Sequence, residues 1–524
     1  MASLARALRT KTANDIVILS AVRSPITRSF KGGFKDAWPE DILGPVMTEA
    51  AKRAKIAPAD VQDVLIGNVL AELGFAKTGR MALVNAGFPV TTTFHTVNRQ
   101  CSSSLQAIAH MSHAIMADQI DVAMAGGVES MTKNYQTRGV PVDVGLTLRS
   151  TPVKSAADCL MPMGITSENV ASRYKISRQM QDEFALLSHT RANEARDAGR
   201  FVAEIVPVEY TARNADTGVA TTVRIQEDDT IRPGVTLEKL AKLKPAFRAD
   251  GASTAGNSSQ ISDGASATIL ARRSWADARG LKPIGRFLGI QVAGCEPDEM
   301  GIGPLLAIPR LYKYVGLEQK DVDIFELNEA FASQTLACIN GLGLDVHKVN
   351  PNGGAIAIGH PTGATGARQL ATLLAELVRQ DKEIGVTSMC ARTSSSALNA
   401  ALDYVQRGVE QRADRPSHRS SYEIVHHGSL FGGRCGHERM HLIYATKVPG
   451  VPDDVPPHGA FEALVQAQGS RLPHDLRGTI EYTVVPAGGV LILEPDFDEF
   501  KGDHDESLGC PSACSCYDGQ WLGL

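Results

Sequence analysis

The chain has 524 residues, of which 43% are hydrophobic and 21% charged, and its formal net charge is -5 at pH 7. This length predicts about two to four domains with sizeable cores. The charge balance gives no sign of nucleic-acid binding, and no apolar run reaches the length of a membrane span, so we expect no integral membrane association. Nine cysteines in so long a chain indicate reduced thiols rather than a disulfide framework.

The first fourteen residues carry Arg6, Arg9 and Lys11 and no acidic residue. Such a basic segment is typical either of a short targeting sequence or of a plain basic terminus. The last residues, Leu522-Gly523-Leu524, do not form a peroxisomal signal of the Ser-Lys-Leu type.

Strand-like and helix-like segments then alternate along the chain, which predicts a layered α/β fold. The expected strands cover residues 15–21 and 61–69, and the expected helices cover residues 41–54, 79–86 and 102–113.

The chain also echoes itself three times in the same order. Residues 60–68 resemble residues 321–328, residues 95–98 resemble residues 347–350, and residues 121–127 resemble residues 384–390. One echo could arise by chance, but three in register predict a duplicated half.

Composition changes at two further places. Residues 132–254 are richer in polar and charged side chains, and eight of the fourteen histidines lie after residue 403. Apolar runs at 442–444, 480–485 and 490–493 predict strands in this last part. Its terminal cysteines, near His504, could suggest a metal site, but their spacing fits no paired zinc pattern, so we interpret the cluster (Cys510, Cys514, Cys516) as incidental.

Two cysteines and a histidine, each beside small residues, carry the strongest chemical signal. They are Cys101, His360 in Gly359-His360-Pro361, and Cys390. A thiolate can attack a thioester or ketone carbon, an imidazole can take the thiol proton, and a second thiol can move a proton to or from carbon. The alternative for any single cysteine is a small buried apolar residue.

Four motifs around these residues resemble those of the thiolase family, and a fifth resembles the degradative 3-ketoacyl-CoA thiolases in particular. They are Asn98-Arg99-Gln100-Cys101-Ser102-Ser103, Asn328-Glu329-Ala330-Phe331, the glycine-rich run 353–361, the segment 255–265, and the segment 158–169. The resemblance runs from about Asp15 to Cys390 and stops just after it.

The resemblance implies the thiolase fold, in which two similar α/β halves pack together with an inserted loop domain. The expected parts are a basic segment (1–14), an N-terminal half (15–131), a loop domain covering CoA (132–254), a return to the N-terminal half (255–280), a C-terminal half (281–402) and an unassigned extension (403–524).

The resemblance also implies roles for four catalytic residues. Cys101 is the nucleophile that carries the acyl thioester, and we expect its sulfur at a helix N-terminus, which stabilises a thiolate. His360 is its base and part of an oxyanion hole, and Asn328 orders a water that completes this hole. Cys390 is the acid/base that protonates the departing acetyl-CoA enolate.

Four further residues match family positions that contact CoA or the acyl chain. Ser259 matches a serine at the pantetheine, Met163 and Phe331 match apolar residues of the thioester channel, and Arg232 matches a cation near the nucleotide. CoA is expected as co-substrate, with no bound cofactor and no metal.

The chain departs from the family pattern at two places. Ser104 replaces a family glycine, a small change that we expect to be tolerated. The usual Cys-x-Gly-x-Gly pattern reads Cys390-Ala391-Arg392-Thr393-Ser394 here. The first of those glycines supplies an oxyanion-hole N–H, and a bulky residue cannot readily adopt a glycine-only backbone conformation.

The leading interpretation is thus a 3-ketoacyl-CoA thiolase of fatty acid β-oxidation with a ping-pong mechanism. The alternatives are an acetoacetyl-CoA thiolase and a catalytically impaired acyl-CoA-binding protein of the same fold. The resemblance further implies a homodimer or homotetramer without nucleic acid. It implies a peroxisomal location, although the sequence shows no matching peroxisomal targeting signal. The mitochondrion is the alternative location, and the cytosol is not excluded.

Overall fold

The computed structural model describes residues 10–139, 141, 143–213, 217–390 and 395–401, and the backbone of four short strands beyond them. The chain divides into two units, Met1–Arg407 and Gly408–Leu524. The altered positions Arg392 and Ser394 and the terminal cysteine cluster lie outside the described residues.

One mixed sheet of ten strands forms the centre of the first unit, in the order β10-β11-β12-β9-β1-β8-β5-β3-β4 with β2 paired to β8. Pairing is parallel for β3 with β4 and β5 and for β10 with β11, and antiparallel elsewhere in the sheet. Its strands are β1 (Ile16–Arg23), β2 (Thr27–Arg28), β3 (Asp63–Gly67), β4 (Thr93–Val97), β5 (Val122–Ser130), β8 (Ser262–Arg272), β9 (Gly285–Ala293), β10 (Ile324–Leu327), β11 (Ile384–Met389) and β12 (Ser395–Ala401). A separate hairpin pairs β6 (Val208–Arg213) with β7 (Ala220–Ile225).

Helices cover both faces of this sheet. The α-helices are α2 (Pro39–Arg53), α3 (Ala76–Asn85), α4 (Ser103–Met116), α5 (Met131–Arg138), α6 (Leu146–Arg149), α7 (Lys154–Asp158), α8 (Met163–Arg173), α9 (Arg178–Asp197), α10 (Leu237–Ala241), α11 (Arg273–Asp277), α12 (Gly303–Val315), α13 (Ala332–Leu342), α14 (Ala355–Ile358) and α15 (Thr365–Gln380). Short 3-10 helices are η1 (Pro58–Asp60), η2 (Glu72–Phe75), η3 (Pro297–Ile302), η4 (Gln319–Asp321) and η5 (Val346–Lys348).

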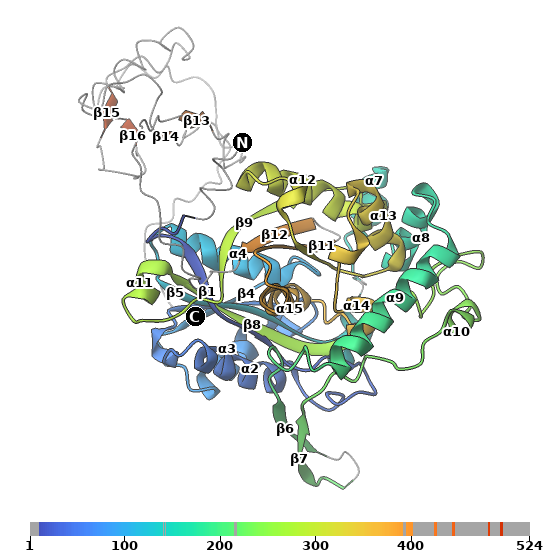
Figure 1. Ribbon diagram of the computed structural model, residues 1–524, viewed down its shortest axis with the longest axis horizontal. Coiled ribbons are helices and arrows are strands. Elements are labelled where there is room, and N and C mark those ends of the chain that lie inside the picture. Colours follow the sequence, from blue (N-terminus) through green and yellow to red (C-terminus); the bar gives the residue numbers. More distant parts are fainter. Residues whose placement is uncertain are drawn as a thin grey trace, which may run out of the picture. The chain divides into compact units, whose positions relative to one another are not determined.

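Burial on both faces of the strands explains the layers. In β1, Val17 and Leu19 pack in a core with α2, whereas Ile16 and Ile18 pack in a second core with α4 and α15. Successive strand residues point to opposite faces, so a strand that is apolar throughout is covered on both sides. In the other half Phe325 packs with α12 and α13, and α4 and α15 lie in the middle of the molecule (Figure 1).

The elements expected from the sequence of the first unit are confirmed, with shifts of a few residues at their ends. The expected strands are β1 and β3, and the expected helices are α2, α3 and α4. Beyond residue 401, β14 (Ile443–Ala445) and β15 (Ile480–Tyr482) fall on two predicted strands, and of the third predicted run only its last residue lies within the described residues. β16 (Leu493–Pro495) begins at the last residue of that run, and β13 (Ile424–His426) was not predicted.

The three sequence echoes occupy equivalent places in the two halves. β3 pairs in parallel with β5 on one side and β4 on the other, and β10 pairs in parallel with β11 and forms a parallel bridge from Phe325 to Val349. The sheet is therefore built from a repeated arrangement, as the echoes predicted.

The segment between β5 and β8 is tied to the second half by charge. The Arg173 guanidinium at the end of α8 contacts Asp298 at 2.6 Å and Glu299 at 2.9 Å, both in η3, and Asn169 donates to the Asp298 carbonyl at 2.9 Å. Arg173 and Lys154 hold the pKa of Asp298 well below its usual range. These contacts fix α8, which begins at Met163, against the second half.

Among the described helices, none has the length and apolarity needed to cross a bilayer.

Candidate active site

The N-termini of the two central helices meet, and this contact brings two predicted site segments together. Cys101 lies two residues before α4 and His360 five residues before α15. The Ala367 N–H donates to Ser104 Oγ at 3.0 Å, so the serine that replaces a family glycine is accommodated with a partner. A Cβ at Gly366 would lie 2.5 Å from Leu105 Cγ, so only glycine permits this approach.

The backbone just before Cys101 is held in an unusual conformation. Gln100 has a φ of 49°, in the left-handed region that non-glycine residues rarely occupy. Asn98 Oδ1 accepts from the Gln100 N–H at 3.0 Å, and Ser103 Oγ accepts from the Arg99 N–H at 2.9 Å while donating to the Gln100 carbonyl at 2.5 Å. The polar residues of the cysteine motif therefore fix the turn that presents Cys101, where strain is often tied to function.

The hydrogen bonds of His360 define its tautomer. Thr365 Oγ1 donates to the Pro361 carbonyl at 2.9 Å, so it accepts from His360 Nδ1–H at 2.7 Å. The lone pair is then on Nε2, toward which Asn328 Nδ2 points at 3.4 Å. An imidazole with its lone pair on Nε2 is arranged to accept a proton at that atom.

Electrostatics keep this imidazole neutral. His360 is 4% exposed, and its burial together with the charge of Arg368 lowers its pKa from 6.5 to about 3. A neutral imidazole is the form that can act as a base.

Cys390 joins the same hydrogen-bonded chain through a glutamine. Its thiol donates to Gln334 Oε1 at 2.9 Å, and Gln334 Nε2 donates to the Asn328 carbonyl at 3.0 Å. Burial raises the pKa of Cys390 well above its usual value, and the nearby Cys101 raises it further. The two predicted catalytic thiols thus lie within electrostatic reach of each other, and Cys101 and Met389 pack in one apolar cluster.

Apolar side chains surround the second thiol. Met300, Ala330 and Phe331 pack with Cys390, and Met163 contacts both this group and the cluster of Cys101. The rings of Phe331 and Phe247 meet edge to face with centroids 5.9 Å apart. Water exclusion around paired thiols strengthens the electrostatic interactions there.

The other two predicted CoA contacts, Ser259 and Arg232, connect to two different segments of the site. The Ser259 N–H donates to the Ala330 carbonyl at 2.9 Å. Arg232 is exposed, and its Nη2 donates to Gln260 Oε1 at 3.0 Å; the Gln260 carbonyl accepts from the His360 N–H at 3.0 Å. Gln260 therefore couples the arginine to the backbone of the histidine.

The structure places three of the predicted catalytic residues, His360, Asn328 and Cys390, on one hydrogen-bonded chain and sets Cys101 beside Cys390. Sequence reasoning missed the side chains that hold this chain together, Thr365 and Gln334. Gln334 lies six residues after Asn328 and Thr365 five residues after His360, so their closeness to a predicted site residue was the available signal.

A buried carboxylate next to the histidine loop was also missed. Glu129, at the end of β5, accepts from Thr362 Oγ1 at 2.8 Å, the Gly363 N–H at 3.1 Å and the Val69 N–H at 3.1 Å. Burial raises the pKa of Glu129 to about 7, although these hydrogen bonds act to lower it. Glu129 thus ties the loop after His360 to the end of β3.

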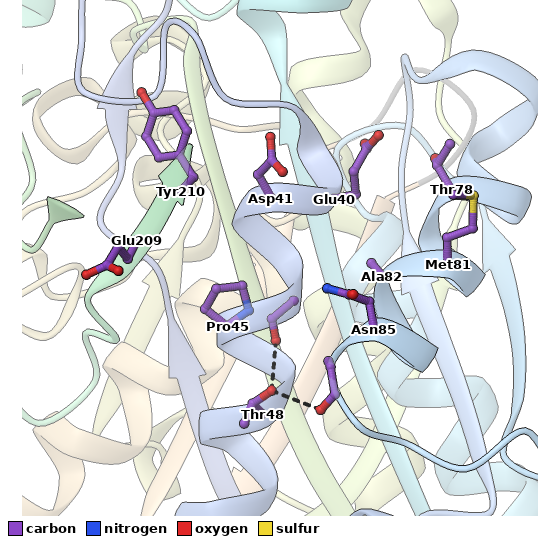
Figure 2. Close-up of a pocket in the computed structure, with 12 residues that line it drawn as sticks. Glu40, Asp41, Pro45, Thr48, Thr78, Met81, Ala82, Asn85, Glu209 and Tyr210 are labelled. Atoms are coloured by element: carbon purple, nitrogen blue, oxygen red, sulfur yellow. Dashed lines mark hydrogen bonds between the residues drawn. The ribbon is translucent and has the colours of Figure 1, made fainter. Parts of the chain in front are cut away.

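A surface cavity of about 490 Å³ lies elsewhere, between α2, α3 and β6 (Figure 2). Its lining includes the carboxylates of Glu40, Asp41 and Glu209, and it contains none of the predicted site residues. Within the described residues, no group of three histidine, cysteine or acidic side chains is arranged to hold a metal ion.

Comparison with known proteins agrees with this geometry. The thiolase N-terminal domain matches residues 16–274 and the thiolase C-terminal domain matches residues 281–401. The chain belongs to the thiolase family. It is 49% identical over 394 residues to 3-ketoacyl-CoA thiolase B, peroxisomal, of Rattus norvegicus, which covers 75% of this chain and 92% of the relative. The human peroxisomal 3-ketoacyl-CoA thiolase gives the same identity and coverage.

Solved structures are similar over the same region. The dimeric peroxisomal thiolase of Saccharomyces cerevisiae is 42% identical with a TM-score of 0.69, covering 76% of this chain and all of that one. The human mitochondrial 3-ketoacyl-CoA thiolase is 36% identical with a TM-score of 0.67, covering 75% of this chain and all of that one. The thiolase fold predicted from the sequence is confirmed.

Proposed function

We propose that this chain is an acyltransferase that cleaves 3-ketoacyl-CoA with free CoA, yielding acetyl-CoA and an acyl-CoA shortened by two carbons. The relatives named above are 3-ketoacyl-CoA thiolases, which supports a place in fatty acid β-oxidation. CoA acts as co-substrate, and the chemistry proposed below needs neither a metal nor a prosthetic group.

In the first half-reaction Cys101 attacks the 3-keto carbon while His360 Nε2 takes the thiol proton. The resulting imidazolium N–H can then donate to the developing oxyanion, together with a water held at Asn328. Asn328 Oδ1 is buried without a partner among the described side chains and backbone, which suits that water. Cleavage of the carbon–carbon bond leaves an acyl group on Cys101 and an enolate, which takes the proton of Cys390.

In the second half-reaction the Cys390 thiolate takes the proton of a CoA thiol. The CoA thiolate attacks the acyl group on Cys101, and the Cys101 sulfur leaves as a thiolate that takes back the proton held on His360 Nε2. This restores both thiols and the neutral imidazole and completes a ping-pong cycle.

The observation that carries this proposal is the hydrogen-bonded chain from Cys390 through Gln334 and Asn328 to His360, beside Cys101. Cleavage of 3-ketoacyl-CoA by the purified chain, measured with short and long acyl chains, tests it. Turnover should vanish in Cys101→Ala and His360→Ala. Absence of turnover in the wild-type chain, with acyl-CoA binding retained, would favour the impaired protein instead.

That second candidate has its own observation. Arg392 and Ser394 stand where the family pattern has glycines, and an oxyanion donor is worth about 10²- to 10³-fold in rate. Acyl-chain preference is a separate question, so an acetoacetyl-CoA thiolase remains the alternative substrate assignment, and the same assay decides it.

The segment 132–254 supports a role in covering CoA. It supplies Met163 to the apolar wall and Arg232, whose pKa is lowered by the partial desolvation of its guanidinium and by the charge of Arg28. Two neighbouring guanidiniums at the outer end of the site suit the phosphates of CoA. We propose the other parts as given from the sequence: a basic segment, the N-terminal half with its return after residue 254, the C-terminal half to residue 402, and an unassigned extension over residues 403–524.

We further infer a peroxisomal homodimer. The similar structure from Saccharomyces cerevisiae is a dimeric peroxisomal thiolase, and the rat and human relatives at 49% identity are both named as peroxisomal. β4 ends the sheet with one edge unpaired among the described strands, and Leu73, Met81 and Val90 expose apolar side chains. Light scattering should give a dimer, or a tetramer of paired dimers, and a monomer at micromolar concentration would contradict this.

A further inference from the structure

Gln334 is hydrogen-bonded to the thiol of Cys390, and the mechanism above gives Gln334 no role. Its Oε1 accepts from the Cys390 thiol at 2.9 Å. Gln334 is 1% exposed and Cys390 0%, so water cannot substitute for either partner. A buried hydrogen bond of this kind affects the protonation state of the group that makes it.

The surroundings fix which end of the amide faces the thiol. Gln334 Nε2 donates to the Asn328 carbonyl at 3.0 Å and to Thr335 Oγ1 at 2.6 Å. Thr335 Oγ1 uses its own proton on the Phe331 carbonyl at 3.0 Å, so it must accept from Gln334. Both Nε2 hydrogens are thereby used, and Oε1, which only accepts, is the atom left for Cys390.

Packing holds the stem of this side chain as well. A Cβ at Gly301 would lie 2.5 Å from Gln334 Cβ, so the glutamine stem fills the space that glycine leaves. Gly301 belongs to η3, the segment that Arg173 and Asn169 tie to α8. The amide is therefore fixed at both its stem and its head.

We propose that Gln334 is the positioning residue that keeps Cys390 a protonated thiol in the resting enzyme and fixes the place of its sulfur. This rests on the proposed acid/base role of Cys390. An acceptor aimed at S–H favours the thiol over the thiolate, so Cys390 rests as an acid and does not compete with Cys101 as a nucleophile.

The same contact serves both half-reactions. When Cys390 gives its proton to the enolate carbon, its sulfur becomes a thiolate facing the negative end of the Gln334 amide. That thiolate is a strong base, and it regains a proton from the incoming CoA thiol. The titratable groups that act on Cys390 are the thiols of Cys101, Cys295 and Cys338, and they shift its pKa in the same direction as its burial.

The test follows alkylation of Cys390 by iodoacetamide against pH, with peptide mass mapping, in a Cys101→Ala background that removes the other catalytic thiol. Gln334→Met keeps the length of the stem and removes the acceptor. It should lower the pH midpoint of alkylation by about one unit, or speed alkylation about tenfold at a pH below both midpoints. Gln334→Glu keeps an acceptor and should leave the midpoint at or above that of the parent.

The proposal is overturned if the pH midpoint of Cys390 alkylation is unchanged in Gln334→Met or lowered in Gln334→Glu. If Gln334→Met does not fold, the midpoint measured for Gln334→Glu decides alone. A merely structural role would change the amount of folded protein and leave the midpoint in place. Full 3-ketoacyl-CoA cleavage by Cys390→Ala would instead refute the acid/base role of Cys390, independently of the alkylation result.

Discussion

Replacing Thr365 by valine removes the hydroxyl that orients His360 and keeps nearly the same volume. In the structure this hydroxyl accepts from His360 Nδ1–H at 2.7 Å and donates to the Pro361 carbonyl at 2.9 Å. Without it, Nδ1–H is buried beside a methyl group, and the proton gains by moving to Nε2, the atom that must receive the Cys101 proton. A buried donor without an acceptor costs about 1 to 3 kcal/mol.

If that cost falls on the reactive tautomer, it corresponds to a loss of about 5- to 150-fold in kcat/KM. The assay is thiolytic cleavage of acetoacetyl-CoA and of a long-chain 3-ketoacyl-CoA by free CoA, with thermal denaturation to verify the fold. Thr365→Ser keeps the hydroxyl and should stay close to wild type. Wild-type kcat/KM in a folded Thr365→Val would refute the tautomer argument, and equal damage in Thr365→Ser would assign the effect to packing of the methyl group.

Three further predictions concern the nucleophile, the buried carboxylate and the altered loop. Incubation with acyl-CoA should place the acyl group on Cys101 by peptide mass mapping, and an adduct on another residue would contradict its role. The pKa of Glu129 is raised from 4.5 to about 7, so the stability that its protonated form contributes is complete below about pH 4.5 and is lost as the pH rises through about 7. Denaturant unfolding from pH 5 to 8 should show the free energy of unfolding fall by an amount approaching about 3 kcal/mol in the wild type but not in Glu129→Gln. Equal pH slopes of the free energy of unfolding in the two proteins would refute this prediction. Arg392→Gly with Ser394→Gly should raise cleavage by about 10-fold or more, unless wild-type turnover already lies in the ordinary range of about 1 to 10³ per second.

Much of the site could be predicted because its chemistry is written in local motifs. The cysteine motif contains its own turn: Asn98 and Ser103 hydrogen-bond the backbone within five residues, so the segment that presents Cys101 is encoded by neighbouring side chains. The same holds for His360 and Thr365, five residues apart. The alternation of apolar strands and helices likewise follows from local burial patterns, which is why the layers were expected.

What the tertiary structure alone decided is the protonation and orientation of these groups. The state of Cys390 depends on Gln334, 56 positions earlier in the chain. Glu129 reaches Thr362 across 233 positions. Such contacts exist because distant segments fold against each other, within the C-terminal half for Gln334 and Cys390 and between the two halves for Glu129 and Thr362. Burial makes each of these hydrogen bonds decisive, since no water can replace a missing partner. The sequence by itself determined which reactive groups this protein has and the local turns that present Cys101 and His360, and only the packing of distant segments decided the protonation of Cys390 and Glu129.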